Sequence, residues 1–442
     1  PNAARLLTPE QRRGENVLPR GAHTRSGTTG SVPSTFATGY LYAGLGYTTA
    51  FDAAVAPLDA RHAHHELDDT PCLDKGFFAL MGNNHYALRA VKSGDRPRLE
   101  AFVAWLLDAA KAYAPKLVNP GGAELWRQTP QARGHGLDDC VPGFDVTPRA
   151  ILSEMTAAAN ALKLPHPVHI HCNQLGAPGN WNTTLETMRT LDGHRAHLAH
   201  VQFHSYGGED ESTLCSRAAE LASYVNEHDN LTVDVGQVMF GDAVAMTGDG
   251  AAAYYLHRLF GKRWFNCDVE CEAGCGVTPI QYRRRSVVNA LQWAIGLEWF
   301  LLIDDPWKVM LSTDHPNGGS FLSYPHLVAL LMNRDLRREM LERCPPEVQE
   351  RCQLKDLDRE YTLSEIAVIT RAAPARALGL RRKGTLQAGA DADIAIYAPN
   401  DDRAVMFESP RLVIKAGEVV VDRGEFRAAP RGRTFHTEAP YD

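Results

Sequence analysis

The sequence predicts an α/β chain in which a TIM-like (β/α)8 barrel is followed by a small β-sandwich lobe. Short β-rich runs alternate with amphipathic helical patterns through most of the chain, which is typical of a parallel sheet covered by helices. The 442 residues leave room for one barrel, which takes about 250 residues as a single unit, and for something smaller. Near residue 380 the pattern changes to short strands separated by glycine turns.

Seven segments have the composition of barrel strands. They are rich in branched and aromatic residues, and turn residues bound them. The predicted strands are residues 47–55, 77–82, 115–119, 167–171, 197–201, 231–236 and 309–314. A barrel of this kind has eight strands, so one is not accounted for.

Amphipathic helices are predicted between the strands. Residues 98–114 place Leu99 and Val103 on one apolar stripe. Residues 182–191 begin with Asn182, a residue type that caps helix N-termini.

The domain boundaries follow the changes of pattern. We predict the barrel over residues 1–380. Within it, residues 237–307 depart from the alternation of strands and helices and are predicted to be an insertion. We predict the β lobe over residues 381–442. Within it, VIKAGEVVV has the pattern of a hairpin.

Composition and charge argue against two classes of partner. A net charge of −7 gives no basic field for nucleic acid. The sequence contains no run of about 18 apolar residues, the length needed to cross a membrane. The opening residues, PNAARLLTPEQRR, lack a signal-peptide pattern, and nine cysteines, an odd number, suit a reducing compartment. We therefore expect a cytoplasmic protein.

Two neighbouring predicted strands carry histidines that could bind a metal. In PVHIH, His169 and His171 share one face, because alternate side chains of a strand point the same way. His171 ends its strand, where barrel active sites form. His200 ends the next strand at a similar height, and imidazole suits zinc. For each histidine alone, a hydrogen-bonded core residue is the alternative.

Two further strand residues fit the same chemistry. Asp314 ends the last predicted strand, where a carboxylate can bind a metal and accept a proton from water; a helix cap is the alternative. Lys116 lies in an apolar strand, and burial favours its neutral amine, which can react with carbon dioxide to give a carbamate. A lysine that reaches the surface is its alternative.

The order of these four residues resembles the pattern of the amidohydrolase superfamily of metal-dependent barrels. In that pattern a lysine lies on barrel strand four, histidines lie on strands five and six, and an aspartate lies on strand eight. The segment KGTLQAGADADIAIY resembles the closing segment of that superfamily. MGNNHY, KLVNPGG, HIHCNQLGAPGNW and HVQFHSYGG together resemble one family across nearly the whole chain. This family is the hydrolase subunit of bacterial formyltransferase/hydrolase complexes, which is related to the corresponding subunit of archaeal formylmethanofuran dehydrogenase.

The resemblance implies two zinc ions bridged by a carboxylated lysine. Matched position by position, Lys116 is that lysine, His171 and His200 are zinc ligands, and Asp314 is both a ligand and the catalytic base. His169 would support the site from one side-chain layer below.

The same resemblance gives candidate substrate contacts. Four candidates follow the ends of predicted strands, where their side chains could touch the formyl group or its carrier. They are Asn84, His85, Asn173 and His204.

One feature of the superfamily is missing from this sequence. Its first metal site uses a His-x-His pair at the end of the first barrel strand, and no such pair stands in a suitable place here. We expect the pair, the first barrel strand and the start of the β lobe upstream of Pro1. Cys267, Cys271 and Cys275 fit no common zinc or iron–sulfur spacing, and we expect them to be incidental.

The predicted function is zinc-dependent hydrolysis of N-formylmethanofuran, or of a methanofuran analogue, to formate and the free amine. The protein would act with the other subunits of a formyltransferase/hydrolase complex and with this small-molecule one-carbon carrier. Three alternatives stay open. They are the formate-condensing direction, a cyclic-amide hydrolase of the hydantoinase or dihydroorotase kind, and a non-catalytic scaffold.

Overall fold

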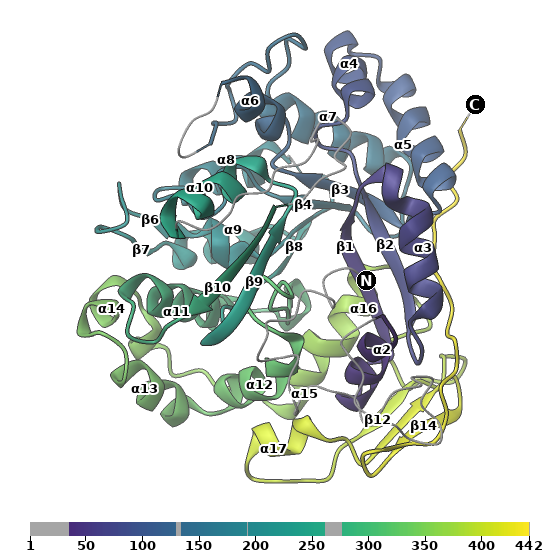
Figure 1. Ribbon diagram of the computed structural model, residues 1–442, viewed down its shortest axis with the longest axis vertical. Helices are drawn as coiled ribbons and strands as arrows, with labels where there is room; N and C mark the ends of the chain where they lie inside the picture. Colours follow the sequence, from purple (N-terminus) through teal and green to yellow (C-terminus); the bar gives the residue numbers. More distant parts are fainter. Residues whose placement is uncertain (1–34, 130–133, 192, 261–275, 442) are drawn as a thin grey trace.

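A seven-stranded parallel sheet forms the centre of the molecule. The computed structural model describes residues 35–129, 134–191, 193–260 and 276–441. Every neighbouring pair in the sheet is parallel, and the sheet curls into a half-barrel (Figure 1). Its strands, in spatial order, are β1 (Thr49–Val55), β2 (Asp74–Leu80), β3 (Ala114–Val118), β4 (Val168–His171), β5 (Ala196–Leu198), β8 (Leu231–Asp234) and β11 (Val309–Met310). All seven predicted strands are thus confirmed, and so is the fold class.

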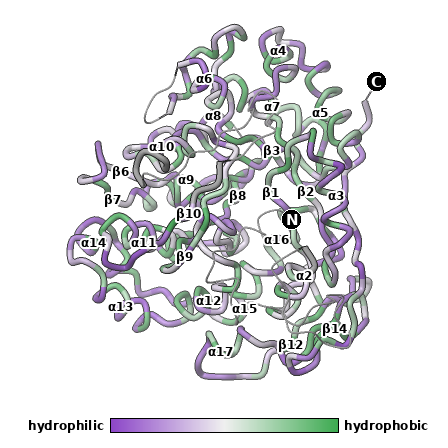
Figure 2. The backbone as a smooth tube through the Cα atoms, viewed as in Figure 1, coloured by the Kyte–Doolittle hydropathy of each residue, from purple (hydrophilic) through white to green (hydrophobic). Residues whose placement is uncertain are grey.

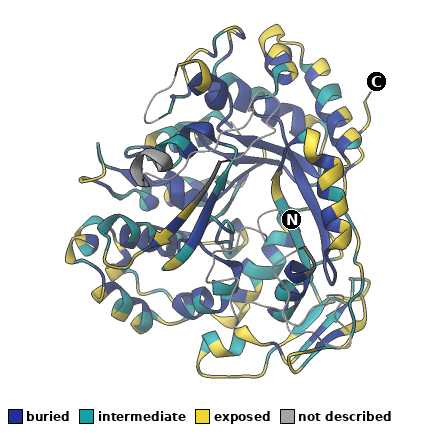
Figure 3. Ribbon diagram, in the orientation of Figure 1, coloured by how far each residue is buried: buried dark blue, intermediate teal, exposed yellow. Residues whose placement is uncertain are grey.

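Helices cover the outer face of this sheet. Hydrophilic residues occur along α3 and α13 (Figure 2), and α3 carries exposed residues while β2 is buried (Figure 3). Every residue of β2, β3, β4 and β5 is buried. The helices are α2 (Thr35–Gly44), α3 (Ala60–Asp69), α4 (His85–Ser93), α5 (Arg96–Ala110), α6 (Gly122–Gln128), α7 (Pro148–Ala161), α8 (Trp181–Thr190), α9 (Ala218–Glu227), α10 (Gly250–Phe260), α11 (Val287–Leu302), α12 (Tyr324–Met332), α13 (Arg334–Glu342), α14 (Pro346–Arg351), α15 (Leu363–Ala367) and α16 (Ala373–Ala377). Among the described helices, none is long and apolar enough to cross a membrane.

Helices α5 and α8 correspond to the two amphipathic segments predicted from the sequence. In α5, Leu99 and Val103 lie in the main core, and the Asp95 carboxylate caps the helix by accepting from the Arg98 N–H at 3.1 Å. The prediction of Asn182 as a cap is wrong, because the residue lies inside α8 and Asn180 precedes the helix. The Asn180 amide donates to the carbonyl oxygens of Gln174, before the helix, and of Phe203, after it.

The predicted insertion, residues 237–307, contains two different structures. An antiparallel pair, β9 (Gly241–Thr247) and β10 (Gly276–Tyr282), stands apart from the main sheet. Helix α11 is buried along most of its length and packs on α9, as a barrel helix between β8 and β11 does. Cys267, Cys271 and Cys275 lie outside the described residues.

The C-terminal lobe is a four-stranded antiparallel sheet. Its strands are β12 (Ile394–Ile396), β13 (Leu412–Lys415), β14 (Glu418–Asp422) and β15 (Glu425–Phe426), and α17 (Arg403–Glu408) packs on α12. The predicted hairpin is confirmed as β13 and β14, joined by Ala416 and Gly417, both with positive φ. Positive φ at both turn residues is typical of the tight turn that matches strand twist.

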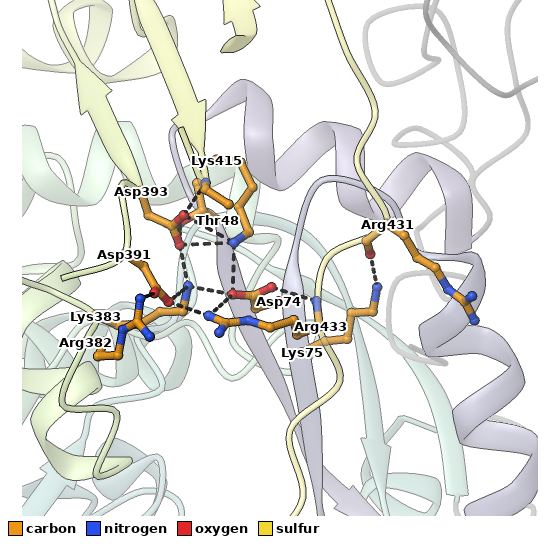
Figure 4. A network of polar contacts seen from close by, with 11 residues as sticks. Thr48, Asp74, Lys75, Arg382, Lys383, Asp391, Asp393, Lys415, Arg431 and Arg433 are labelled. Atoms are coloured by element: carbon orange, nitrogen blue, oxygen red, sulfur yellow. Dashed lines mark hydrogen bonds and ion pairs between the residues drawn. The ribbon is translucent and has the colours of Figure 1, made fainter. Parts of the chain in front are cut away.

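A buried ionic network joins this lobe to β2 (Figure 4). Asp74, which is 1% exposed, accepts hydrogen bonds from Lys415 Nζ at 2.9 Å and from the Arg433 N–H at 2.7 Å. Lys383 contacts both Asp74 and Asp393 at 2.5 Å. Burial alone would raise the pKa of Asp74, but hydrogen bonds from Lys383 and Lys415 lower it below its usual range. Lys383, Lys415 and Arg433 therefore hold the C-terminal part of the chain to Asp74 of the barrel.

Replacing Asp74 with asparagine should lower the free energy of unfolding by roughly 3–5 kcal/mol, because the buried Lys383 and Lys415 lose one of the carboxylates that they contact. Urea unfolding would measure the change. Asp145→Asn is the matched control, since Asp145 pairs with Lys92 on the surface and should change stability little. Equal effects of the two substitutions would contradict a structural role for the network.

Candidate metal centre

Four of the predicted site residues surround one cavity at the carboxyl ends of the parallel strands. The cavity has a volume of about 600 Å³. Lys116 of β3, His171 of β4, His200 after β5 and Asp314 after β11 all line it. Parallel strands end at the same edge of a sheet, so side chains far apart in the sequence converge there.

A cluster of three histidines forms one wall of the site. The ring centroids of His171 and His200 are 4.6 Å apart, and each lies 5.3 Å from the ring of His204. Burial, and then the proximity of His171, lower the pKa of His200 and of His204 well below the usual value for histidine. Burial also lowers the pKa of His171. All three rings are therefore neutral at pH 7, which is the form that binds metals.

Several ring nitrogens of this cluster lack hydrogen-bond partners. Within the described part of the chain, His200 Nδ1 and both ring nitrogens of His204 are buried without a partner. A buried polar atom without a partner costs about 1–3 kcal/mol, and a metal ion would satisfy a bare imidazole nitrogen. The cluster thus fits a metal such as zinc. We predicted His204 as a substrate contact, and the structure places it among these possible ligands.

Lys116 is buried in the middle of β3, opposite His169 on β4. No hydrogen bond or ion pair holds its ammonium group within the described residues, although the charges of Asp234 and Asp314 act on it. Burial lowers its pKa to about 8. The lower pKa increases the neutral fraction of the amine at neutral pH, and the neutral amine is the form that reacts with carbon dioxide.

Asp314 follows the last strand of the sheet with a φ of 47°, in the left-handed region. Such strain in a residue other than glycine costs about 1–3 kcal/mol and is concentrated at functional sites. Burial, and then the negative charge of Asp234, raise the pKa of Asp314 well above its usual value. A raised pKa makes the ionised carboxylate a stronger proton acceptor.

Asp234 and Asp249, which are not among the residues predicted from the sequence, also lie at the site. Asp234 ends β8, and its Oδ1 accepts a hydrogen bond of 2.9 Å from the backbone N–H of His200. Asp249 is 1% exposed, and its Oδ2 lies 3.4 Å from His171 Nε2. Asp234 could have been selected, because it lies near the end of a predicted strand as Asp314 does. No sequence signal marked Asp249, which lies within the predicted insertion.

Asn173 acts at one end of a hydrogen-bond chain and does not line the cavity. Its amide donates to Asn119 Oδ1 at 2.8 Å, and the Asn119 amide donates to Asp249 at 2.9 Å. This chain connects Asn173 to Asp249, whose carboxylate lies beside His171.

Asn84 and His85 likewise lie away from the cavity lining. Asn84 caps α4 by accepting from the N–H groups of Tyr86 and Ala87, and His85 lies 3.4 Å from the Glu124 carboxylate. Both residues thus have structural partners in the described part of the chain, and their contact with the substrate stays a prediction. His169, by contrast, does line the cavity, below His171.

Gly236 fixes the distance between two of the possible ligands. Its φ is +68°, and a Cβ added there would lie 2.4 Å from His200 Cβ and 3.4 Å from Asp314 Cβ. We expect Gly236→Ala to displace His200 and to lower turnover roughly 10²-fold, since catalysis is that sensitive to a displacement of about 1 Å. Zinc analysis and kinetics would measure this.

Gly143→Ala is the control for Gly236→Ala. Gly143 also has a positive φ, +79°, but a Cβ there meets no atom within 4 Å. Its substitution should cost about 1–2 kcal/mol of stability and leave turnover unchanged. Equal turnover in the two variants would contradict the steric argument.

Comparison with known proteins identifies relatives along nearly the whole chain. Residues 8–421 match the model of the amidohydrolase family. Protein FwdA of Methanocaldococcus jannaschii is 45% identical over 456 residues, which cover 99% of this chain and 80% of that protein. The A subunit of the formyltransferase/hydrolase complex Fhc of Methylorubrum extorquens is 37% identical over 452 residues, with the same coverage.

A solved structure agrees with these relatives. The crystal structure of the formyltransferase/hydrolase complex (FhcABCD) from Methylorubrum extorquens, in complex with methylofuran, contains a chain that is 36% identical. The superposition covers 96% of this chain and 78% of that one, with a TM-score of 0.91.

Proposed function

The chain belongs to the amidohydrolase family, in the branch of FwdA and the Fhc hydrolase subunit, and from this premise we propose that it hydrolyses an N-formyl amine with the help of two zinc ions. The substrate would be formylmethanofuran or an analogue of it, and the products formate and the free amine. The convergence of Lys116, His171, His200 and Asp314 on one cavity is the observation that carries this proposal.

The lining of the cavity supports a carrier with an aromatic part. Side chains that can stack on a furan or phenol ring surround the polar groups. They are Tyr42, Phe51, Phe203, Tyr206, Tyr282 and Tyr324. The solved FhcABCD complex, which contains a related chain and was determined with methylofuran, supports the same class of carrier.

His171, His200 and Lys116, the last as its carbamate, would hold the zinc ions together with Asp314. Bound zinc would polarise the formyl oxygen and lower the pKa of water to about 7. The Asp314 carboxylate accepts the proton of the attacking water and passes it to the leaving amine nitrogen. During this transfer Asp234 holds His200 by accepting a hydrogen bond from the backbone N–H of His200. Asp249 holds His171 from its position beside His171 Nε2.

The protein would work as one subunit of a complex, as its Fhc relative does. The formate-condensing direction uses the same groups in reverse order, so the concentrations of formate and amine decide the direction. A cyclic-amide hydrolase would share the metal site but not the substrate.

Release of formate tests the proposal directly. We expect the full-length protein, purified with its partner subunits, to release formate from an N-formylated aminomethylfuran and to leave hydantoin and dihydrouracil unchanged. Formate would be measured enzymatically, and zinc per chain by elemental analysis. Turnover of the cyclic ureides without formate release would show a cyclic-amide hydrolase, and absence of zinc would show a scaffold.

A further inference from the structure

A second set of possible metal ligands lies deeper in the barrel than His171 and His200. It consists of His169 on β4, His197 on β5 and Asp234 at the end of β8. One ligand atom of each lies within 4.8 Å of the others. His197 Nε2 is 3.2 Å and His169 Nε2 is 3.8 Å from the same oxygen, Oδ2 of Asp234. The three side chains come from three neighbouring strands.

Hydrogen-bond direction shows which nitrogen of His169 carries the proton. The Ala377 carbonyl can only accept, so His166 Nδ1, 2.8 Å away, must donate to it. A buried histidine without a carboxylate partner stays neutral, and His166 Nε2 is then an acceptor. His169 Nδ1, 3.3 Å from that nitrogen, must donate. His169 Nε2 is therefore bare and lies beside the Asp234 carboxylate.

His197 can present a bare Nε2 in the same way. Its Nδ1 lies 2.9 Å from the Thr232 hydroxyl, which can accept or donate a hydrogen bond. When His197 Nδ1 donates to Thr232, its Nε2 is left free for a ligand. Asp234 Oδ2 faces the ring nitrogens of His197 and His169, because the hydrogen bond from the backbone N–H of His200 goes to Oδ1. In metal sites, ligating histidines donate their other ring N–H to a fixed acceptor, and ligating carboxylates are themselves hydrogen-bonded.

The spacing also suits a metal ion. Ligands about 2.0–2.1 Å from a tetrahedral zinc lie roughly 3.3 Å from one another. The observed separations of 3.2 and 3.8 Å from Asp234 Oδ2 need only small side-chain adjustments to reach this value. His169 and Asp234 line the cavity, so water can complete the coordination.

We propose that His169, His197 and Asp234 form an additional mononuclear site for a divalent transition metal, separate from the proposed catalytic pair. The ion would link β4, β5 and β8 below the catalytic site. The positive charge of Lys116 opposes the binding of a cation at this site. Carboxylation of Lys116 would make its charge negative, and in this respect the inference rests on the proposed function. A purely hydrogen-bonded cluster, in which His197 Nε2 donates to Asp234, is the competing reading.

Anomalous diffraction above and below the zinc absorption edge separates the two readings. Crystals of the full-length protein in its complex, grown with Zn²⁺, should show a peak between His169, His197 and Asp234. Peaks only beside His171 and His200 would overturn this inference and leave the proposed function intact. A peak only at the deeper set would support the inference and contradict the proposed catalytic pair.

Zinc affinity gives a second test that does not depend on activity. Thr232→Val removes the acceptor for His197 Nδ1. It should lower the binding affinity for one zinc ion 10–100-fold, as measured in competition with a chelator, which is the typical effect of losing such a partner. Thr156→Val is the matched control, since Thr156 is fully buried and its hydroxyl has no partner among the described residues. Identical zinc affinities in the two variants would overturn the inference.

Discussion

Replacing Asp314 with asparagine should reduce formate release by roughly 10²–10⁴-fold, the usual contribution of a general base, while most of the zinc stays bound. Asparagine has the size of aspartate and also tolerates the left-handed backbone that this residue adopts, so the loop should keep its shape. His171 and His200 remain in place as ligands. The variant lacks only the ionised oxygen that takes the proton.

Steady-state kinetics and zinc analysis of the purified complex would measure the Asp314→Asn effect. Asp229→Asn is the control, because Asp229 is an exposed partner of Lys308 and does not line the cavity. Near-normal turnover of Asp314→Asn would remove Asp314 from the mechanism. Loss of both zinc and turnover would show that it acts mainly as a ligand.

Two buried lysines should respond in opposite ways to substitution by methionine. We expect Lys116→Met to lower zinc content and to reduce turnover by at least about 10²-fold, because metal chemistry supplies several kcal/mol of transition-state stabilisation. The fold should keep its stability, since methionine fills a similar volume and removes an amine that is costly to bury.

Lys75→Met is the matched control for Lys116→Met. Burial lowers the pKa of Lys75 to about 8, as it does for Lys116. The Lys75 ammonium, however, donates to the carbonyl oxygens of Thr70, at 2.8 Å, and of Arg431. Its loss leaves both acceptors unsatisfied and should cost roughly 1–3 kcal/mol for each, with zinc content unchanged in the folded protein.

Urea unfolding, zinc analysis and ¹³C NMR after incubation with labelled bicarbonate would compare the two lysine variants. A carbamate signal present in the wild type and in Lys75→Met, but absent from Lys116→Met, is the expected pattern. A signal that persists in Lys116→Met would contradict the assignment of the modified lysine.

The sheet and the position of its possible ligands could be predicted from the sequence because both depend on local pattern. Alternation of side chains places His169 and His171 on one face, and the end of each strand places His200 and Asp314 at the edge where parallel strands meet. The hairpin of β13 and β14 could be predicted for the same reason, since its glycine turn and its strands are adjacent in the chain.

Several partners could not be predicted, because they come from elements that are distant in the sequence. Asp249 approaches His171 from a loop beyond β9, and Asn173 reaches it only through Asn119. Asn182 and Asn180 have the same capping chemistry, and only the path of the loop before α8 decides which one precedes the helix. Side-chain type gives the possible bond, and the fold selects the partner.

The sequence by itself determined that this chain forms a parallel α/β sheet and that lysine, histidine and aspartate gather at one end of it, since strand period and strand ends are properties of short segments. The tertiary structure decided that His204 joins the cluster, that Asn84 and His85 serve the local structure, and that Asp234 stands between two sets of histidines. Those outcomes depend on the register of strands and the crossing of loops, where a shift of one residue changes which polar atoms lie within bonding distance.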